Sequence, residues 1–81
     1  MTTLITGGAG FLGTYLTKLL IAEGEKPVLL DPAPMPETLK SVSAEIEYVR
    51  NSLDCLSILI NIIRKYSVDR IFHLGGMLSA P

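Results

Sequence analysis

Residues 4–14 read LITGGAGFLGT, in which four glycines separate an apolar start from an amphipathic continuation. Gly8, Gly10 and Gly13 fit the spacing G-x-G-x-x-G, and counted from Gly7 the same stretch fits G-x-x-G-x-x-G. Such a match is informative only where it follows a strand and opens a helix. The residues around it therefore decide whether these glycines hold a phosphate or loosen a turn.

Strand-like and helix-like patterns alternate along the chain. Residues 2–6 are short, apolar and β-branched, whereas residues 11–23 place leucines at helical spacing before Gly24. Strands are predicted over residues 2–6, 27–31, 46–50 and 70–74, and long helices over residues 11–23 and 52–66. This order predicts an α/β fold with a parallel sheet, right-handed crossovers and one helix on each face.

Three further expectations concern the connection after the second strand, the start of the second long helix and the faces of that helix. Three prolines alternate over residues 32–36 and favour extended backbone, with one helical turn expected over residues 37–41. Ser52 or Asp54 is the expected N-cap of the second long helix. That helix is apolar nearly all round, with one face formed by Leu56, Leu59, Ile60 and Ile63. We expect its other apolar side, Ile58 and Ile62, to contact something besides the sheet.

Composition favours a single small soluble domain. The 81 residues are 48% hydrophobic and carry 7 basic against 8 acidic side chains, so no basic surface invites nucleic acid. No apolar stretch reaches the roughly 18 residues of a membrane span, and the start lacks a secretory leader. We therefore expect a cytoplasmic protein without a membrane partner. Cys55 stands alone, which excludes a disulfide framework, and we interpret it as a small helix hydrophobe.

The context of the glycines favours dinucleotide binding. Asp31 follows Gly13 by eighteen residues, at the end of the second predicted strand. Gly10 would let the backbone approach a pyrophosphate, and the N–H groups that open the helix attract phosphate. Asp31 can accept hydrogen bonds from both adenosine ribose hydroxyls and would repel a 2′-phosphate, which predicts NAD rather than NADP. The alternative is a glycine-rich connector in which Asp31 caps a turn.

The chain resembles the N-terminal part of the extended short-chain dehydrogenases/reductases, the NAD-dependent epimerase/dehydratase group that acts on nucleotide sugars. Four stretches carry the resemblance: TGGAGFLG, VLLD, IEYVRNSLD and IFHLGGMLSA. The ending HLGGMLSA is also similar to the threonine dehydrogenase branch. The resemblance implies a partial Rossmann-type sheet, with about four strands in the order third, second, first, fourth, and a ligand crevice between the first and fourth.

The resemblance also implies positions that contact the cofactor. They are Gly7, Gly10, Phe11, Leu12, Gly13, Asp31, Ser52, Leu53, Leu74, Gly75 and Gly76. Phe11 and Leu12 would lie at the pyrophosphate, and Leu74 with the two glycines after it at the nicotinamide end. Ser79 would lie near the substrate and is equally an ordinary loop serine. No metal site is implied.

After the third strand the family usually has a Gly-Asp pair whose aspartate reaches the adenine amino group. Here Asn51 and Ser52 stand in its place, followed by Leu53, whose N–H the family also uses. The Ser52 hydroxyl can accept the adenine bond or cap the next helix, and both interpretations stay open. Asp54, displaced by two residues, is a second candidate.

No residue is assigned to catalysis. His73, the only histidine, lies in a predicted buried strand, and we interpret it as a core side chain with one hydrogen bond. The family's chemistry requires a tyrosine with a lysine four residues later. Four residues after Tyr15, Tyr48 and Tyr66 stand Leu19, Ser52 and Arg70.

The resemblance therefore implies a catalytically incomplete N-terminal portion of a longer NAD-dependent epimerase, dehydratase or dehydrogenase that acts on a small molecule. One alternative is a stand-alone, non-catalytic dinucleotide-binding module. The other is a fragment that self-associates through the open sheet edge or through Ile58 and Ile62.

Overall fold

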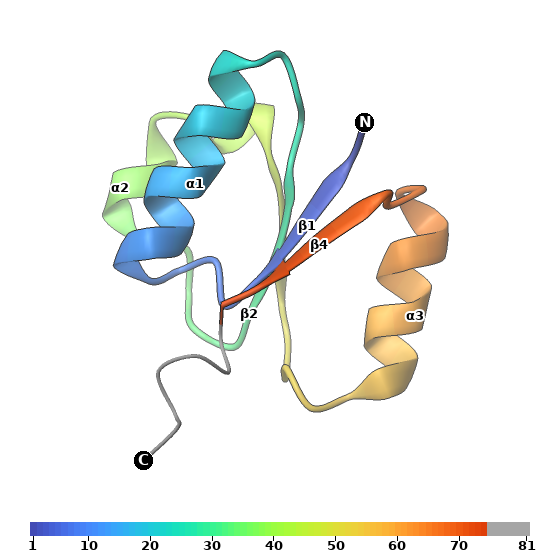
Figure 1. The fold of residues 1–81 in the computed structure, drawn as a ribbon. Coiled ribbons are helices and arrows are strands. Elements are labelled where there is room, and N and C mark those ends of the chain that lie inside the picture. The colour runs from blue at the N-terminus through green and yellow to red at the C-terminus, as the bar shows by residue number, and fades with distance from the viewer. Residues whose placement is uncertain (75–81) are drawn as a thin grey trace.

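A computed structural model describes residues 1–74, which form a four-stranded parallel sheet between layers of helix (Figure 1). The strand order is β3-β2-β1-β4, which confirms the predicted topology. The direction of the crossovers reverses between β1 and β4, where a crevice for a ligand is expected. Along the chain the elements are β1 (Thr3–Thr6), α1 (Phe11–Ala22), β2 (Val28–Asp31), α2 (Glu37–Lys40), the 3-10 turn η1 (Ser43–Glu45), β3 (Glu47–Arg50), α3 (Leu56–Lys65) and β4 (Arg70–His73).

The two central strands, β1 and β2, are buried along their whole length, as expected for apolar runs covered on both faces. β3 and β4 flank them and are partly exposed. At the carboxyl ends of the strands the register pairs Asp31 with Arg50 and Thr6 with His73. The last residues of the four strands therefore lie side by side at the carboxyl end of the sheet.

An apolar layer covers each face of the sheet. On one face α1 and α2 pack over a cluster that includes Ile5 and Leu29, and on the other α3 packs over Leu4, Val28 and Leu30 (Figure 1). Neighbouring residues of a strand point to opposite faces, which is why Leu29 and Leu30 belong to different layers. The prediction of a helix on each face is confirmed, and the short α2 adds to the layer of α1.

α1 buries few of its residues and leaves much of its apolar stripe exposed. Its buried residues are Gly13, Thr17 and Leu20, and the Thr17 hydroxyl donates to the Gly13 carbonyl at 2.7 Å. Leu12 and Tyr15 are 53% and 61% exposed. The spacing of the leucines predicts the helix correctly but does not identify the side that faces the sheet.

α3 begins later than the sequence predicts. Its first residue is Leu56 and its N-cap is Cys55, which makes no side-chain capping bond. The predicted N-caps at Ser52 and Asp54 are therefore wrong. Instead, the N–H of Asp54 donates to the Ser52 hydroxyl at 3.2 Å. A local bond of this kind competes with helical backbone and delays the start of the helix.

The buried face of α3 also differs from the prediction. Ile58 and Ile62 pack against the layer of Leu4, and Ile62 is only 5% exposed. Leu56 and Ile60 are 67% and 40% exposed. The expected association surface of Ile58 and Ile62 is therefore wrong, because both side chains lie on the sheet.

Ser67, which follows the C-cap of α3, has a left-handed backbone with a φ of 52°. Glycine adopts this conformation without strain, so Ser67→Gly is expected to raise the free energy of unfolding by about 0.5–1 kcal/mol. Urea denaturation measures the change. The control Ser57→Gly, in the first turn of α3, is expected to lower stability. A loss of stability in Ser67→Gly would show that φ causes no strain there.

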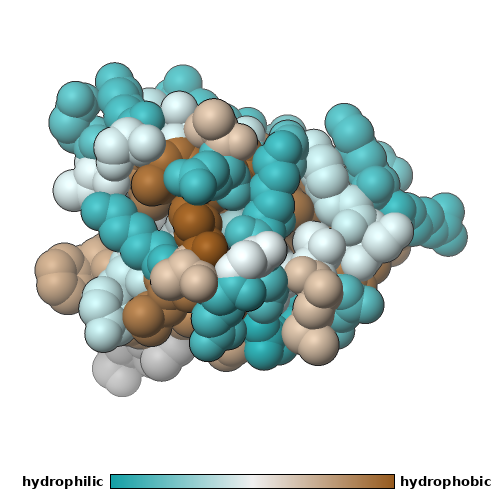
Figure 2. Space-filling view, turned by 90° about the horizontal axis from the view of Figure 1, so that it is seen from above, coloured by the Kyte–Doolittle hydropathy of each residue, from teal (hydrophilic) through white to brown (hydrophobic). Residues whose placement is uncertain are grey.

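The edge where the strands begin is held by polar side chains. Arg70 donates to the Thr3 hydroxyl at 3.1 Å and to Glu25 at 2.8 Å, and Lys26 pairs with Glu47 at 3.1 Å. Seen from this end, hydrophilic residues surround a strip of hydrophobic ones (Figure 2). Within the part of the chain that the structure describes, no helix is long and apolar enough to cross a membrane.

Candidate functional site

The loop between β1 and α1 turns at Gly7. Its φ is +77°, a left-handed conformation that glycine adopts readily. The N–H of Gly7 donates to the carbonyl of Leu30 at 2.8 Å, which ties the loop to β2. The spacing counted from Gly7 therefore describes the turn in this chain.

Gly8 and Gly13 are required by close contacts within the protein. A Cβ on Gly13 would lie 2.7 Å from both the Cα and the O of Gly8, and a Cβ on Gly8 would lie 2.7 Å from a side-chain carbon of Leu29. The helix thus lies directly on the loop. The absence of a side chain at Gly13 thus permits a close approach between the helix and the loop backbone.

Gly10 has no such contact. Among residues 1–74, a Cβ built there would have only the carbonyl oxygen of Gly7 within 4 Å, at 3.9 Å, and its φ of −74° and ψ of 174° suit any residue. The pocket beside it is lined by Ala9, Gly10, Phe11, Thr14, Tyr15, Lys18 and Thr38. The described part of the chain therefore does not need glycine at this position, whereas a ligand that approached the backbone would need it.

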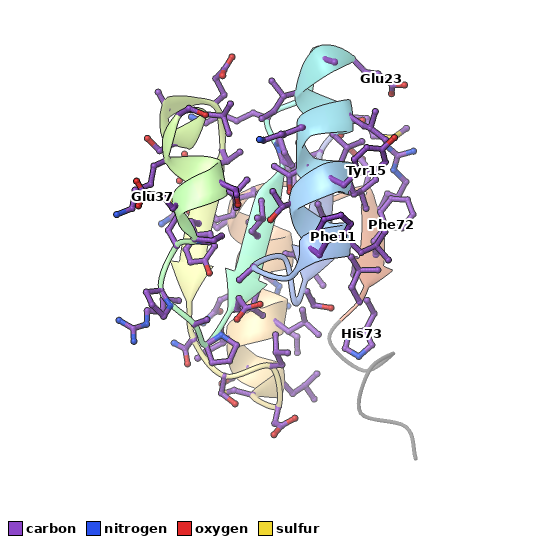
Figure 3. The ribbon with its side chains drawn as sticks, turned by 90° about the vertical axis from the view of Figure 1, so that its left-hand side faces the viewer. Phe11, Tyr15, Glu23, Glu37, Phe72 and His73 are labelled. Atoms are coloured by element: carbon purple, nitrogen blue, oxygen red, sulfur yellow. The ribbon has the colours of Figure 1, made fainter. Side chains whose placement is uncertain are left out.

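The first turn of α1 carries no capping side chain and no acidic residue. Its first hydrogen bond runs from the Thr14 N–H to the Gly10 carbonyl at 2.9 Å. The N–H groups of Phe11, Leu12 and Gly13 precede it and have no partner within the helix. Phe11 lies at the end of the helix (Figure 3). The residue is 93% exposed. A helix terminus of this kind attracts negative charge.

Asp31 ends β2 with its side chain turned toward the glycine loop. Its Oδ2 accepts the N–H of Ala9 at 3.0 Å and its Oδ1 accepts the N–H of Ala33 at 2.9 Å. The residue is 9% exposed. Asp31 thus caps the following turn, as the alternative prediction has it. A carboxylate offers about four acceptor positions, so it retains capacity for ribose hydroxyls.

Three side chains hold the backbone of Pro32 and Ala33. Besides Asp31, the Tyr48 hydroxyl donates to the Ala33 carbonyl at 2.8 Å, and the Nε–H of Arg50 donates to the Pro32 carbonyl at 3.1 Å. Burial, and then the charge of Asp31, raise the pKa of the Tyr48 phenol, so it stays protonated and able to donate at neutral pH. The chain leaving β2 is thereby fixed beside Asp31.

An open pocket lies at the carboxyl ends of β2 and β3. It is lined by Pro32, Arg50, Asn51, Ser52, Leu53 and Asp54. The exposed Ser52 does not cap α3, although its hydroxyl already accepts the Asp54 N–H. Leu53 is half-buried against the layer under α3. The structure therefore brings both predicted adenine contacts, and Asp54, to one pocket.

His73 lies at the tip of β4, at the same end of the sheet as Phe11 (Figure 3). Its Nδ1 is hydrogen-bonded to the hydroxyl of Thr6, and the next N–H, of Leu74, donates to the Thr6 carbonyl at 2.9 Å. The predicted single hydrogen bond is confirmed. The predicted burial is wrong, because β4 is an edge strand within residues 1–74 and leaves His73 exposed. Leu74 packs against the layer under α1.

Cys55 stands at the N-cap of α3, half-exposed, rather than inside the helix as predicted. Its Sγ contacts the Ser57 hydroxyl at 3.3 Å. That hydrogen bond, followed by one from the Ile58 N–H, lowers the pKa of the thiol. The interpretation of Cys55 as a helix hydrophobe is therefore wrong.

Three predicted site residues, Gly75, Gly76 and Ser79, lie outside the described residues, and their roles stay predictions. Among residues 1–74, no group of three His, Cys, Asp or Glu side chains is placed to hold a metal ion.

A family model described as GDP-mannose 4,6 dehydratase matches residues 4–80. The chain is 28% identical over 83 residues to a UDP-glucose 4-epimerase of Neisseria gonorrhoeae, covering 95% of this chain and 25% of the relative. It is 32% identical over 82 residues to a dTDP-glucose 4,6-dehydratase of Haemophilus influenzae, covering 94% and 24%.

Among solved structures, the Bordetella bronchiseptica enzyme WbmG in complex with NAD matches with a TM-score of 0.77 and 25% identity, over 90% of this chain and 24% of that one. This chain thus spans about a quarter of the length of the relatives it matches. Because the family model covers nearly the whole sequence, the chain belongs to the GDP-mannose 4,6 dehydratase family, within the NAD-dependent epimerases and dehydratases.

Proposed function

We propose that this chain is the N-terminal, NAD-binding part of a longer nucleotide-sugar epimerase, dehydratase or related dehydrogenase. The uncapped first turn of α1 carries the proposal, because it offers N–H groups that have no partner within the helix, behind a glycine turn where a diphosphate can approach. The family membership and the relative crystallised with NAD support it. A single cysteine favours a reducing compartment, and we place the protein in the cytoplasm.

Each part of the dinucleotide has a partner along the carboxyl edge of the sheet. We assign the N–H groups of Phe11 and Leu12 to the diphosphate and the free acceptor positions of Asp31 to the adenosine ribose. Adenine is assigned to the pocket that holds Ser52 and Leu53. The nicotinamide end lies toward Leu74, near the tips of β1 and β4.

NAD, when bound, accepts a hydride from a carbon that bears a substrate hydroxyl. The residues of this chain bind and orient the cofactor. They include no tyrosine followed four residues later by lysine, so we assign proton transfer and substrate selection to a further part of the enzyme. The relatives' names, a UDP-glucose epimerase and a dTDP-glucose dehydratase, favour a nucleotide sugar as the substrate.

Titration with NADH, followed by the fluorescence of its dihydronicotinamide ring, tests the proposal. Saturable binding is expected, with weaker binding of NADPH because the Asp31 carboxylate repels a 2′-phosphate. A chain that is folded by circular dichroism and does not saturate with NADH would contradict the proposed function.

Asp31→Asn is expected to weaken NADH binding by about tenfold and to reduce the preference for NADH over NADPH, since the repelling charge is removed. Part of the loss will come from the loop, because Asp31 also holds the N–H groups of Ala9 and Ala33. A loosened loop would weaken the binding of NADH and NADPH equally. The ratio of the two affinities therefore separates the loss of the loop contacts from the loss of the repelling charge. Asp69→Asn, at the opposite edge, is the control and should leave both affinities unchanged. An unchanged ratio in Asp31→Asn would assign Asp31 to the loop alone.

A further inference from the structure

Arg50, the last residue of β3, is exposed and lies at the end of the sheet where the proposed adenosine site lies. Its Nε–H donates to the Pro32 carbonyl at 3.1 Å, and the side chain lines the open pocket with Pro32 and residues 51–54. Among residues 1–74 its remaining N–H groups make no hydrogen bond to protein. One contact therefore orients the guanidinium plane and leaves its faces available.

Arg50 lies next to Asp31 without pairing with it. The two residues are partners in the β2–β3 register, yet no ion pair within 4.0 Å joins them in the described part of the chain. The carboxylate is turned instead to the N–H groups of Ala9 and Ala33. Strand residues two apart point to the same face, so Arg50 shares the face of Tyr48, whose hydroxyl donates to the Ala33 carbonyl. The guanidinium is thus held by neutral backbone and not by an acid.

We propose that the guanidinium of Arg50 lies against the face of the adenine base and strengthens binding of the adenosine half of the dinucleotide. The proposal rests on the proposed function and adds a residue that selects for the base. A planar, weakly hydrated guanidinium stacks well on aromatic rings, which the compact ammonium of lysine does not do. A side chain already oriented by Pro32 loses little freedom when the base arrives.

Arg50→Ala tests the proposal through ligands that differ in the base. NADH and ADP-ribose both carry adenine, whereas reduced nicotinamide mononucleotide does not. The variant is expected to bind NADH and ADP-ribose about fivefold more weakly and the mononucleotide with unchanged affinity. Arg50→Lys should recover little of the loss, because it restores the charge without the plane. Arg64→Ala, which removes an exposed arginine from α3, is the control and should bind all three ligands as the unchanged chain does.

Three results would overturn the proposal. Binding of NADH by Arg50→Ala within twofold of the unchanged chain would show that the guanidinium does not touch the base. Full recovery in Arg50→Lys would assign its effect to charge. An equal loss of affinity for the mononucleotide would show that the effect does not depend on the base. Each of these leaves the proposed function standing, whereas failure of the unchanged, folded chain to bind NADH would remove both.

Discussion

Gly10→Ala is expected to weaken NADH binding by at least about tenfold while changing the free energy of unfolding by less than about 1 kcal/mol. The added methyl group meets nothing closer than 3.9 Å among the residues that the structure describes, and the backbone angles suit alanine. It would, however, occupy the space through which a diphosphate approaches the first turn of α1. The added methyl group should therefore lower the affinity for NADH without lowering the stability of the fold.

Fluorescence titration with NADH and urea denaturation of the same variant separate the two quantities. Thr14→Ala, one turn further along α1 and lining the same pocket, is the comparison variant and should lose less affinity. Normal NADH affinity in Gly10→Ala would contradict the placement of the diphosphate at this turn. A large loss of stability would show that glycine is needed for folding there.

Gly13→Ala is expected to lower the free energy of unfolding by about 2–3 kcal/mol, the upper part of the range for overpacking a close contact. Its Cβ would lie 2.7 Å from the Cα and the carbonyl oxygen of Gly8, and backbone cannot move aside as a flexible side chain can. A loss of this size is a large fraction of the stability of a small domain.

Urea denaturation compares the stability of Gly13→Ala with that of Gly10→Ala. The pair is well matched because both variants add the same methyl group, three residues apart. We expect Gly13→Ala to unfold at a clearly lower urea concentration. Equal midpoints would contradict the close contact between α1 and the loop.

The strands follow from the sequence because each run is short and is bounded by glycine, proline or charge, whereas their order in the sheet is implied by the family resemblance. Pro27 marks the start of the run that becomes β2, and helical connections between strands require parallel pairing. Boundaries agree to within a residue or two for every strand. Local composition determines these elements, so tertiary contacts are not needed to find them.

Helix faces and edge exposure depend on contacts that the sequence does not display. α3 is apolar on several sides, so its periodicity could not show that Ile62 lies on the sheet while Leu56 faces away. His73 ends an apolar run, but its burial depends on a neighbour that β4 does not have among residues 1–74. In both cases the neighbours of the element decide burial.

The candidate site is predictable where spacing alone defines it. The glycines and Asp31 are found by spacing, because a turn, a helix and a strand have characteristic lengths. Spacing does not predict the bonds of Tyr48 and Arg50 to the connection after β2. They depend on the pairing of Asp31 with Arg50, which is defined only once β2 and β3 are in register. The sequence offers one signal of these bonds: Tyr48 and Arg50 are two residues apart in a predicted strand, so their side chains lie on the same face.

The amide resonances of α1 report directly on whether a diphosphate binds at the start of this helix. In a two-dimensional NMR titration of the isotope-labelled chain with NAD, the N–H signals of Phe11 and Leu12 are expected to shift saturably, because those groups would donate to the diphosphate. Adenosine, which lacks phosphate, should leave them in place. Saturable binding of NAD that shifts other residues and leaves Phe11 and Leu12 unmoved would contradict the placement of the diphosphate at the start of α1.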